Sequence, residues 1–388
     1  MKVLFIISNY PHKNNPVSGN FYKIICEQLA CKGIEVYVIC PVPYIPFWLG
    51  LIFKRLDIYR SYPEFEDKNA VKIYRPRYFR LTFGNFKTRY AHANMRVLTR
   101  AKKIKPDIID VRNYYPAFPF GWFALNINKA LGTPFIYTNN GVGIHLSENE
   151  NKFRVAFYKE LLKKASKIFA VSTEIIKEIK DVYKVDASII RHGIEISKYS
   201  SVVTQKRDPN SKVFKIIYVG EMSYLKGVDT LISAIRLLND HEIHYTFVGA
   251  NNMGNDIDAV KNKENITYLG RLKHQEALNE IAQSDLLILP TKFEGMPNVL
   301  KEAGILNVPV ISTYVGGITE LLNNGERGEL FEAGNETELA QKIEKVKNNY
   351  SEAKHKSNLL NAYIIKEYDI ERNTLDLINS YKKVLNIQ

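Results

Sequence analysis

Cysteine is scarce in this chain. Only Cys26, Cys31 and Cys40 occur among 388 residues, and each lies in an apolar segment near the start. A small, odd number of cysteines favours neither a disulfide framework nor a metal site. We therefore expect three reduced cysteines in the core of a cytosolic protein.

Long uninterrupted apolar runs are absent as well. The stretch from Met1 to Ile7 is basic and then apolar, but it continues into Asn9-Tyr10-Pro11 without a cleavage site. We expect a first strand there rather than a signal peptide. The aromatic stretch from Pro41 to Phe53 is too short and too rich in proline to span a bilayer. Low-complexity tracts and short-period repeats, which would indicate disorder or a solenoid, are also missing.

Acidic residues are missing from one long segment. Residues 71–105 hold eleven Lys and Arg and no Asp or Glu, with interleaved aromatic residues Tyr74, Tyr78, Phe79, Phe83, Phe86 and Tyr90. Residues 1–200 contain 32 Lys and Arg against 16 Asp and Glu, whereas the remainder contains 22 against 25, so the net charge of +13 belongs to the first half. A solvated helix face is the plain interpretation of such a run.

The same segment also favours a binding partner. With the neighbouring Phe47 and Trp48, the basic and aromatic region 44–105 predicts contact with an anionic membrane surface. Single-stranded nucleic acid is the competing partner for basic residues among aromatics. No RNA- or DNA-binding motif is present, so we expect no nucleic acid partner.

Alternating strand and helix patterns fill the rest of the chain. A chain of 388 residues that is 45% hydrophobic is long enough for two cores. Two alternating halves flank a polar stretch, which predicts a first domain at 1–200, a linker at 201–213 and a second domain at 214–367. A final amphipathic stretch runs from about Ser357 to Leu385.

One stretch of the second half predicts a ligand site. Leu286 to Leu289 is a short apolar run typical of a buried strand, and Pro297 fits the first turn of a helix that ends near Leu306. The next strand spans 308–312, so the unit is a right-handed crossover in a parallel sheet. Ligands bind such sheets at the carboxyl ends of the strands. The free N–H groups of Asn298, Val299 and Leu300 would form an anion site there.

Two acids lie beside this predicted anion site. Glu294 is in the loop, and Glu302 is about one turn into the helix. Carboxylates do not bind phosphate, but they accept strong hydrogen bonds from the hydroxyl groups of a sugar or a ribose.

Glu294-Gly-Met-Pro-Asn-Val-Leu-Lys-Glu302 resembles the Glu-x7-Glu donor motif of retaining family 4 glycosyltransferases. The segment from Pro309 to Leu321, which contains Gly316-Gly317, resembles the next segment of that family. The resemblance implies an α/β fold of the GT-B class, with two Rossmann-like domains whose parallel sheets face a central cleft. It also implies that a C-terminal helix at about 368–388 packs back on the first domain.

The resemblance implies a set of donor-binding residues. In the family, the loop here spelled Gly220 to Gly227 carries a basic pair that holds the donor diphosphate. Lys226 matches the second member, but Glu221 stands where the first is usually Arg, so Arg271 is the candidate for the other charge. The implied donor-binding residues are Gly19, Gly220, Lys226, Arg271, Glu294, Gly295, Met296, Pro297, Asn298, Val299, Leu300 and Glu302.

The first half departs from the family pattern at three positions, one of which is Asn20, where the family often has a second glycine after the one matched by Gly19. Many relatives have a His near the donor sugar where this chain has Asn140, and His145 lies five residues further on. The family usually has Asn where this chain has His192. Gly19 matches a loop glycine that lets the backbone approach the donor or acceptor. The implied catalytic residues are Glu294, Lys226 and Asn140.

No metal or cofactor is expected beside the nucleotide sugar. Asp256-Ile-Asp258 has the spelling of a metal-binding Asp-x-Asp, but its surroundings are typical of a helix N-terminus. A UDP-sugar is favoured over a GDP-sugar by its frequency in the family.

The resemblance implies a retaining hexosyltransferase of capsule, exopolysaccharide or teichuronic-acid assembly in bacteria. Its donor would be a nucleoside-diphosphate sugar and its acceptor a lipid-linked glycan. Its place would be the cytoplasm, on the inner face of the plasma membrane. Two alternatives stay open from the residues. One is a GT-B donor-binding subunit that has lost catalysis, motivated by Glu221 and Asn140, and the other is a sugar-nucleotide epimerase.

Overall fold

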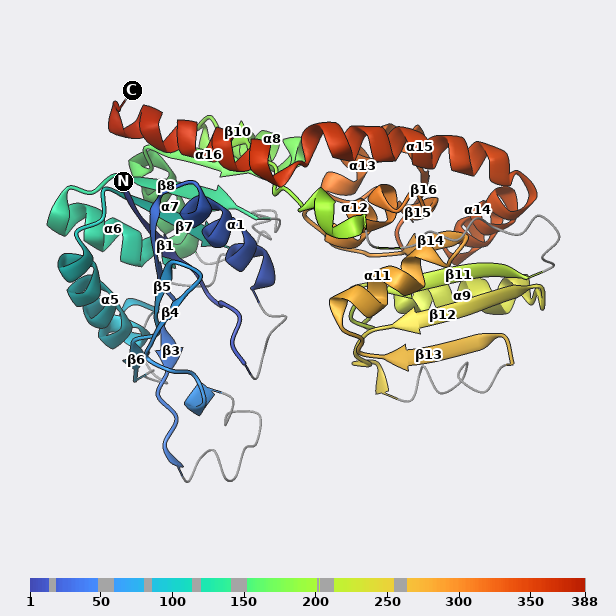
Figure 1. The fold of residues 1–388 in the computed structure, drawn as a ribbon, viewed down its shortest axis with the longest axis horizontal. Coiled ribbons are helices and arrows are strands. Elements are labelled where there is room, and N and C mark those ends of the chain that lie inside the picture. The colour runs from blue at the N-terminus through green and yellow to red at the C-terminus, as the bar shows by residue number, and fades with distance from the viewer. Residues whose placement is uncertain are drawn as a thin grey trace. The chain divides into compact units, whose positions relative to one another are not determined.

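The computed structural model describes residues 1–13, 19–47, 59–79, 86–113, 120–140, 152–200, 202, 213–254 and 264–387. Two compact units make up the chain (Figure 1). The first contains Met1–Val171, Ile175–His192 and Ile370–Gln388, and the second contains Ser172–Glu174 and Gly193–Asp369. Each unit is an α/β structure built on one large sheet.

The sheet of the first unit has the strand order β10-β9-β8-β7-β1-β2-β5-β4. All neighbouring strands are parallel except the edge pair β4 and β5. The strands are β1 Lys2–Ile6, β2 Glu35–Ile39, β4 Phe65–Lys68, β5 Val71–Tyr74, β7 Ile108–Asn113, β8 Phe135–Asn139, β9 Lys167–Ala170 and β10 Ser188–Ile189. A separate pair is formed by β3 Val42–Pro43 and β6 Arg77–Tyr78.

Helices cover this sheet because their apolar faces need partners. Helix α1 packs against α16, and α5, α6 and α7 pack one against the next. The helices are α1 Asn20–Cys31, α4 Phe86–Arg89, α5 Ala91–Ile104, α6 Phe120–Leu131, α7 Lys152–Lys164, α8 Thr173–Tyr183 and α16 Ile370–Leu385. In α1 the buried side chains Tyr22, Ile25, Cys26 and Leu29 recur at helical spacing, which places one stripe on the core.

The second unit has a six-stranded parallel sheet in the order β13-β12-β11-β14-β15-β16. The strands are β11 Phe214–Val219, β12 Ile243–Val248, β13 Ile266–Gly270, β14 Leu286–Leu289, β15 Val310–Thr313 and β16 Glu329–Phe331. The helices are α9 Val228–Leu238, α11 His274–Ala282, α12 Asn298–Ile305, α13 Gly317–Leu321, α14 Glu336–Asn348 and α15 Tyr350–Glu367, with 3-10 turns η1 Ile196–Tyr199 and η3 Asn323–Gly325.

The C-terminal helix expected at about 368–388 is α16, which follows α15 after Tyr368 and Asp369 and belongs to the first unit. The structure differs from the sequence-based expectations in two local features. The two units divide between His192 and Gly193 rather than at residue 200, because Ile194 bridges to Asp369 and donates its N–H to the Tyr368 carbonyl. Cys31 is exposed at the end of α1, so the expectation of three core cysteines was wrong for this one.

The described part of region 44–105 exposes several large apolar side chains. Phe47 is 63% exposed, Phe79 57% and Met95 55%. The guanidinium of Arg60 lies 4.7 Å above the Phe47 ring, so a cation accompanies the most exposed aromatic residue. Within the described ranges, every helix is too short or too polar to cross a bilayer.

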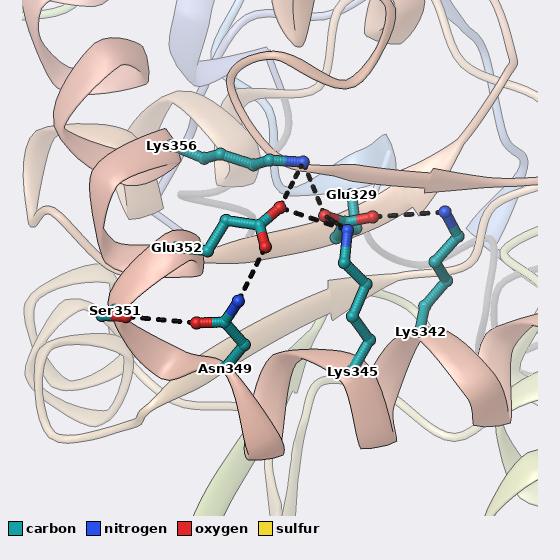
Figure 2. A network of polar contacts seen from close by, with 7 residues as sticks. All are labelled: Glu329, Lys342, Lys345, Asn349, Ser351, Glu352 and Lys356. Atoms are coloured by element: carbon teal, nitrogen blue, oxygen red, sulfur yellow. Dashed lines mark hydrogen bonds and ion pairs between the residues drawn. The ribbon is translucent and has the colours of Figure 1, made fainter.

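A cluster of charged side chains ties the edge of the second sheet to two helices (Figure 2). Glu329 on β16 accepts from Lys345 on α14 at 2.9 Å and from Lys356 on α15 at 2.6 Å. Its other oxygen accepts from Lys342 at 3.2 Å. Burial alone would raise the pKa of Glu329, but the lysine hydrogen bonds outweigh it and lower the pKa to about 2.

The depressed pKa of Glu329 predicts how the stability of the second unit depends on pH. Because the folded value lies below the ordinary 4.5, the contribution of Glu329 is complete above pH 4.5 and is lost as the pH falls towards 2. Glu329→Gln removes the buried charge that three partly exposed lysines share, although Lys345 and Lys356 keep Glu352 as a partner, so we expect a loss of about 1–2 kcal/mol at pH 7. Urea unfolding from pH 8 to pH 2 measures both effects.

The exposed neighbour Glu332 provides the matched control, as Glu332→Gln. The difference in free energy of unfolding between Glu329→Gln and the unmodified chain should be constant from pH 8 to pH 5 and should shrink below pH 4.5. If Glu329→Gln lowers the free energy of unfolding at pH 7 no more than Glu332→Gln does, this role of the cluster is contradicted.

Candidate functional site

The carboxyl edge of the second sheet carries the candidate donor site. Strand β14 is fully buried, and a loop leads from Pro290 to helix α12. Pro297 is the N-cap of α12 with extended backbone angles, so the helix begins at Asn298 and the placement of Pro297 in the first turn was wrong by one residue. Pro297 makes no side-chain capping hydrogen bond. The first N–H groups of α12, from Asn298, Val299 and Leu300, have no acceptor within the helix, which is the arrangement that favours an anion.

Lys226 and Glu294 meet at this edge. The Lys226 ammonium donates to Glu294 Oε1, although the two residues are 68 positions apart in the sequence. Both side chains are partly exposed, at 25% and 19%. The Lys226 ammonium and the Glu294 carboxylate thus form an ion pair close to the start of α12.

Glu302 has a partner that the sequence motif does not indicate. His274, the first residue of α11, lies with Nε2 2.9 Å from Glu302 Oε1. The Glu302 hydrogen bond raises the pKa of His274 and outweighs burial, which acts in the opposite direction. Side-chain exposure is 58% for His274 and 15% for Glu302, so the carboxylate lies at the back of the site and the imidazole near solvent. A His at the start of a helix gave no signal of this contact in the sequence.

Two glycines let other segments reach the loop between β14 and α12. Gly227 has a φ of 68°, and a Cβ there would lie 1.8 Å from the Pro290 carbonyl oxygen. Gly316 has a φ of 55°, and a Cβ there would lie 1.9 Å from the Glu294 carbonyl oxygen. Any side chain at either position would displace the loop. The neighbouring Gly317 donates its N–H to the Gly295 carbonyl at 2.7 Å.

The remaining donor-side residues occupy the same edge. Gly220 follows β11 directly, and a Cβ there would lie 2.9 Å from the Tyr218 hydroxyl. Glu221, the departure from the family pattern, accepts a hydrogen bond from Asn252. Arg271 follows β13 and is exposed. Met296 accepts from the Tyr368 hydroxyl at 3.5 Å, which anchors its side chain.

The first unit brings Asn140 and His192 together at the carboxyl edge of its own sheet. Asn140 follows β8 and is only 4% exposed, and its Oδ1 lies 2.7 Å from His192 Nε2. Gly19 is the N-cap of α1 with a φ of 76°, and a Cβ there would lie 2.6 Å from the Asn9 carbonyl oxygen. His145 lies outside the described residues, as do Asp256 and Asp258.

No cluster of three or more His, Cys, Asp or Glu side chains suited to a metal ion occurs in the part of the chain that the structure describes. The candidate site there consists of carboxylates, ammonium groups, an imidazole and backbone N–H groups. These groups bind hydroxyls and phosphates.

Comparison with protein families gives the class of the chain. Residues 19–198 match the family model Glycosyltransferase Family 4, and residues 203–362 match Glycosyl transferases group 1. The chain is a family 4 glycosyltransferase. This glycosyltransferase is 28% identical to the putative teichuronic acid biosynthesis glycosyltransferase TuaC of Bacillus subtilis (strain 168), and the alignment covers 83% of each chain.

Solved structures share the fold of this glycosyltransferase. Sucrose-phosphate synthase from Thermosynechococcus elongatus superposes with a TM-score of 0.79 at 16% identity over 99% of each chain. The Anabaena protein HepE in complex with UDP and glucose superposes with a TM-score of 0.71 at 16% identity over 99% of this chain and 100% of HepE. The α/β fold of the GT-B class is confirmed, with Rossmann-like parallel sheets in both units.

Proposed function

We propose that this glycosyltransferase moves a hexose from a nucleoside-diphosphate sugar to a glycan acceptor with retention of anomeric configuration. The observation that carries the proposal is the pair of partly exposed acids, Glu294 and Glu302, beside the uncapped start of α12. Each acid already holds one hydrogen-bond donor, Lys226 or His274. The hydroxyl groups of a sugar and a ribose are donors of the same kind.

Each donor-side residue has a distinct task in this proposal. Glu302 accepts from the ribose hydroxyls, and Glu294 accepts from a sugar hydroxyl. Lys226, the first N–H groups of α12 and the exposed Arg271 hold the diphosphate. Gly220 lets the backbone of the second unit approach the donor, and Gly295, Met296 and Pro297 shape the loop around the sugar. Gly19 leaves the same freedom to the backbone of the first unit. UDP is the favoured nucleotide, in keeping with the UDP bound by HepE.

Transfer proceeds on one face of the sugar. The bond between the anomeric carbon and the phosphate oxygen breaks, and the acceptor oxygen bonds to the anomeric carbon from the same side. The acceptor proton passes to the departing phosphate. Negative charge grows on that phosphate as the bond breaks, and Lys226 with the α12 N–H groups stabilises it there. In the first unit, Asn140 offers its side-chain amide as a further hydrogen-bond donor. This route uses no metal ion.

The basic and aromatic region 44–105 supports a membrane location and a lipid-linked acceptor for the proposed reaction. The similarity to TuaC supports a role in cell-surface polysaccharide biosynthesis. The exposed Phe47, Phe79 and Met95, with basic residues around them, suit the inner face of the plasma membrane and a lipid-linked acceptor. Co-sedimentation with phosphatidylglycerol vesicles tests this part. Equal binding to phosphatidylcholine vesicles, or none to either, would count against it.

Replacing Glu294 by Ala tests the catalytic assignment. The variant loses the carboxylate that accepts from the sugar, so we expect transfer from UDP-glucose to fall at least about 100-fold. Release of UDP in the presence of a membrane-extract acceptor measures the rate. Glu332→Ala, which changes an exposed acid of the same unit, serves as the control. Full transfer by Glu294→Ala would sink the assignment.

A further inference from the structure

A row of buried polar side chains leads through the first unit to Asn140. It begins at Tyr381 on α16, whose hydroxyl donates to Asp110 Oδ2 at 2.5 Å. Asp110 in turn accepts two parallel hydrogen bonds from Arg112, at 3.0 Å from Nε and 2.9 Å from Nη2. The side chains of Asp110 and Arg112 are wholly buried. Such a bidentate pair holds the guanidinium in one orientation.

The protonation states in this row are fixed by its surroundings. Burial alone would lower the pKa of Arg112, but Asp110 outweighs it and raises the pKa, so the guanidinium keeps its charge. Burial and Asp110 raise the pKa of Tyr381, so the hydroxyl keeps its proton. Arg112 and Tyr381 therefore act only as donors towards their neighbours in the row.

The contact with Arg112 favours one tautomer of His192. Arg112 Nη1 lies 3.5 Å from His192 Nδ1, and a guanidinium has hydrogens but no lone pair to offer. We therefore assign Nδ1 as the acceptor, which places the proton of the neutral ring on Nε2. That N–H points at Asn140 Oδ1, 2.7 Å away.

The orientation of the Asn140 amide follows from this tautomer. Because its oxygen accepts from His192, its NH2 group faces the other way, with the Tyr22 hydroxyl as a distant acceptor at 3.5 Å. The amide follows the last residue of β8, at the sheet edge where ligands of parallel sheets bind. The ring of Phe21 lies 4.9 Å from that of His192 and supports it from the start of α1.

We propose that His192 is a positioning residue of the transfer reaction, which holds the Asn140 amide in one orientation at the carboxyl edge of the first sheet, where an amide N–H group is available to a substrate oxygen. This inference rests on the proposed function. Asn140 and His192, two of the positions where the first half departs from the family pattern, are the two partners of one hydrogen bond. One departure thus compensates for the other.

Two substitutions separate this role from a structural one. Asn140→Asp keeps the shape of the side chain but removes its N–H donors, and we expect kcat for UDP release from UDP-glucose to fall about 100-fold. His192→Ala removes the hydrogen bond that orients the Asn140 side-chain amide, so the amide is free to rotate. We expect a similar fall in kcat, with the KM for UDP-glucose changed less than about threefold. His192→Gln, whose amide N–H can replace Nε2–H, should recover a large part of the rate.

The double variant, Asn140→Asp with His192→Ala, tests whether His192 acts through Asn140. If His192 acts through Asn140, adding His192→Ala to Asn140→Asp changes kcat by less than about twofold, whereas independent roles give losses that multiply. Multiplying losses, or a His192→Ala enzyme with the unmodified rate, would overturn the proposal. His244→Gln, at the amino end of β12, controls for the loss of a partly buried histidine.

Glu294→Ala measured in the same assay keeps the two claims apart. An inactive Glu294→Ala beside a fully active His192→Ala overturns the positioning role and leaves the proposed function standing. A fully active Glu294→Ala overturns the proposed function itself. Melting temperatures of all variants, read with and without UDP, show whether each still folds and binds. If His192→Ala does not fold, the rates of Asn140→Asp and His192→Gln carry the test.

Discussion

The loop between β14 and α12 depends on two backbone approaches that exclude a side chain. Gly227 lies against the Pro290 carbonyl at the start of this loop, and Gly316 lies against the Glu294 carbonyl further along. The Lys292 N–H also donates to the Leu225 carbonyl at 2.9 Å, so the loop is held by the segment before α9. With the loop fixed on both sides, Glu294 stays beside Lys226, and α12 begins where its N–H groups face the sheet edge. The chemistry of the second unit follows from this steric constraint.

The charged groups of the second unit balance one another before any donor binds. Glu294 holds Lys226, and Glu302 holds His274. Under the proposed function, the hydroxyls of a nucleotide sugar would bind to the acids and its phosphate oxygens to Lys226, so both contacts would be replaced by equivalent ones. In the first unit the buried charges of Asp110 and Arg112 neutralise each other. Their effect on Asn140 is indirect, because Arg112 contacts His192 and His192 forms a hydrogen bond with the Asn140 oxygen.

The sequence predicted those features that depend on neighbours along the chain. The bounds of β14 agree with the apolar run Leu286–Leu289, the end of α12 lies within one residue of the expected Leu306, and the family motif named the acids of the candidate donor site. Contacts between distant residues were not predictable, since no pattern joins His274 to Glu302 or His192 to Asn140. The start of the C-terminal helix near residue 368 came from the family resemblance, and Cys31 was misplaced because it lies at the last turn of α1. The roles of the site residues stay predictions.

Binding of nucleotide to the purified protein tests the central claim most directly. A ligand that binds only the folded state raises the melting temperature by mass action. We would measure melting temperatures with UDP, GDP, ADP, UDP-glucose, uridine and inorganic phosphate. The account predicts a clear rise with one nucleoside diphosphate, UDP first, a further change with its sugar conjugate, and little with uridine or phosphate alone. No rise with any nucleoside diphosphate or sugar conjugate would contradict a donor site at Glu294 and Glu302.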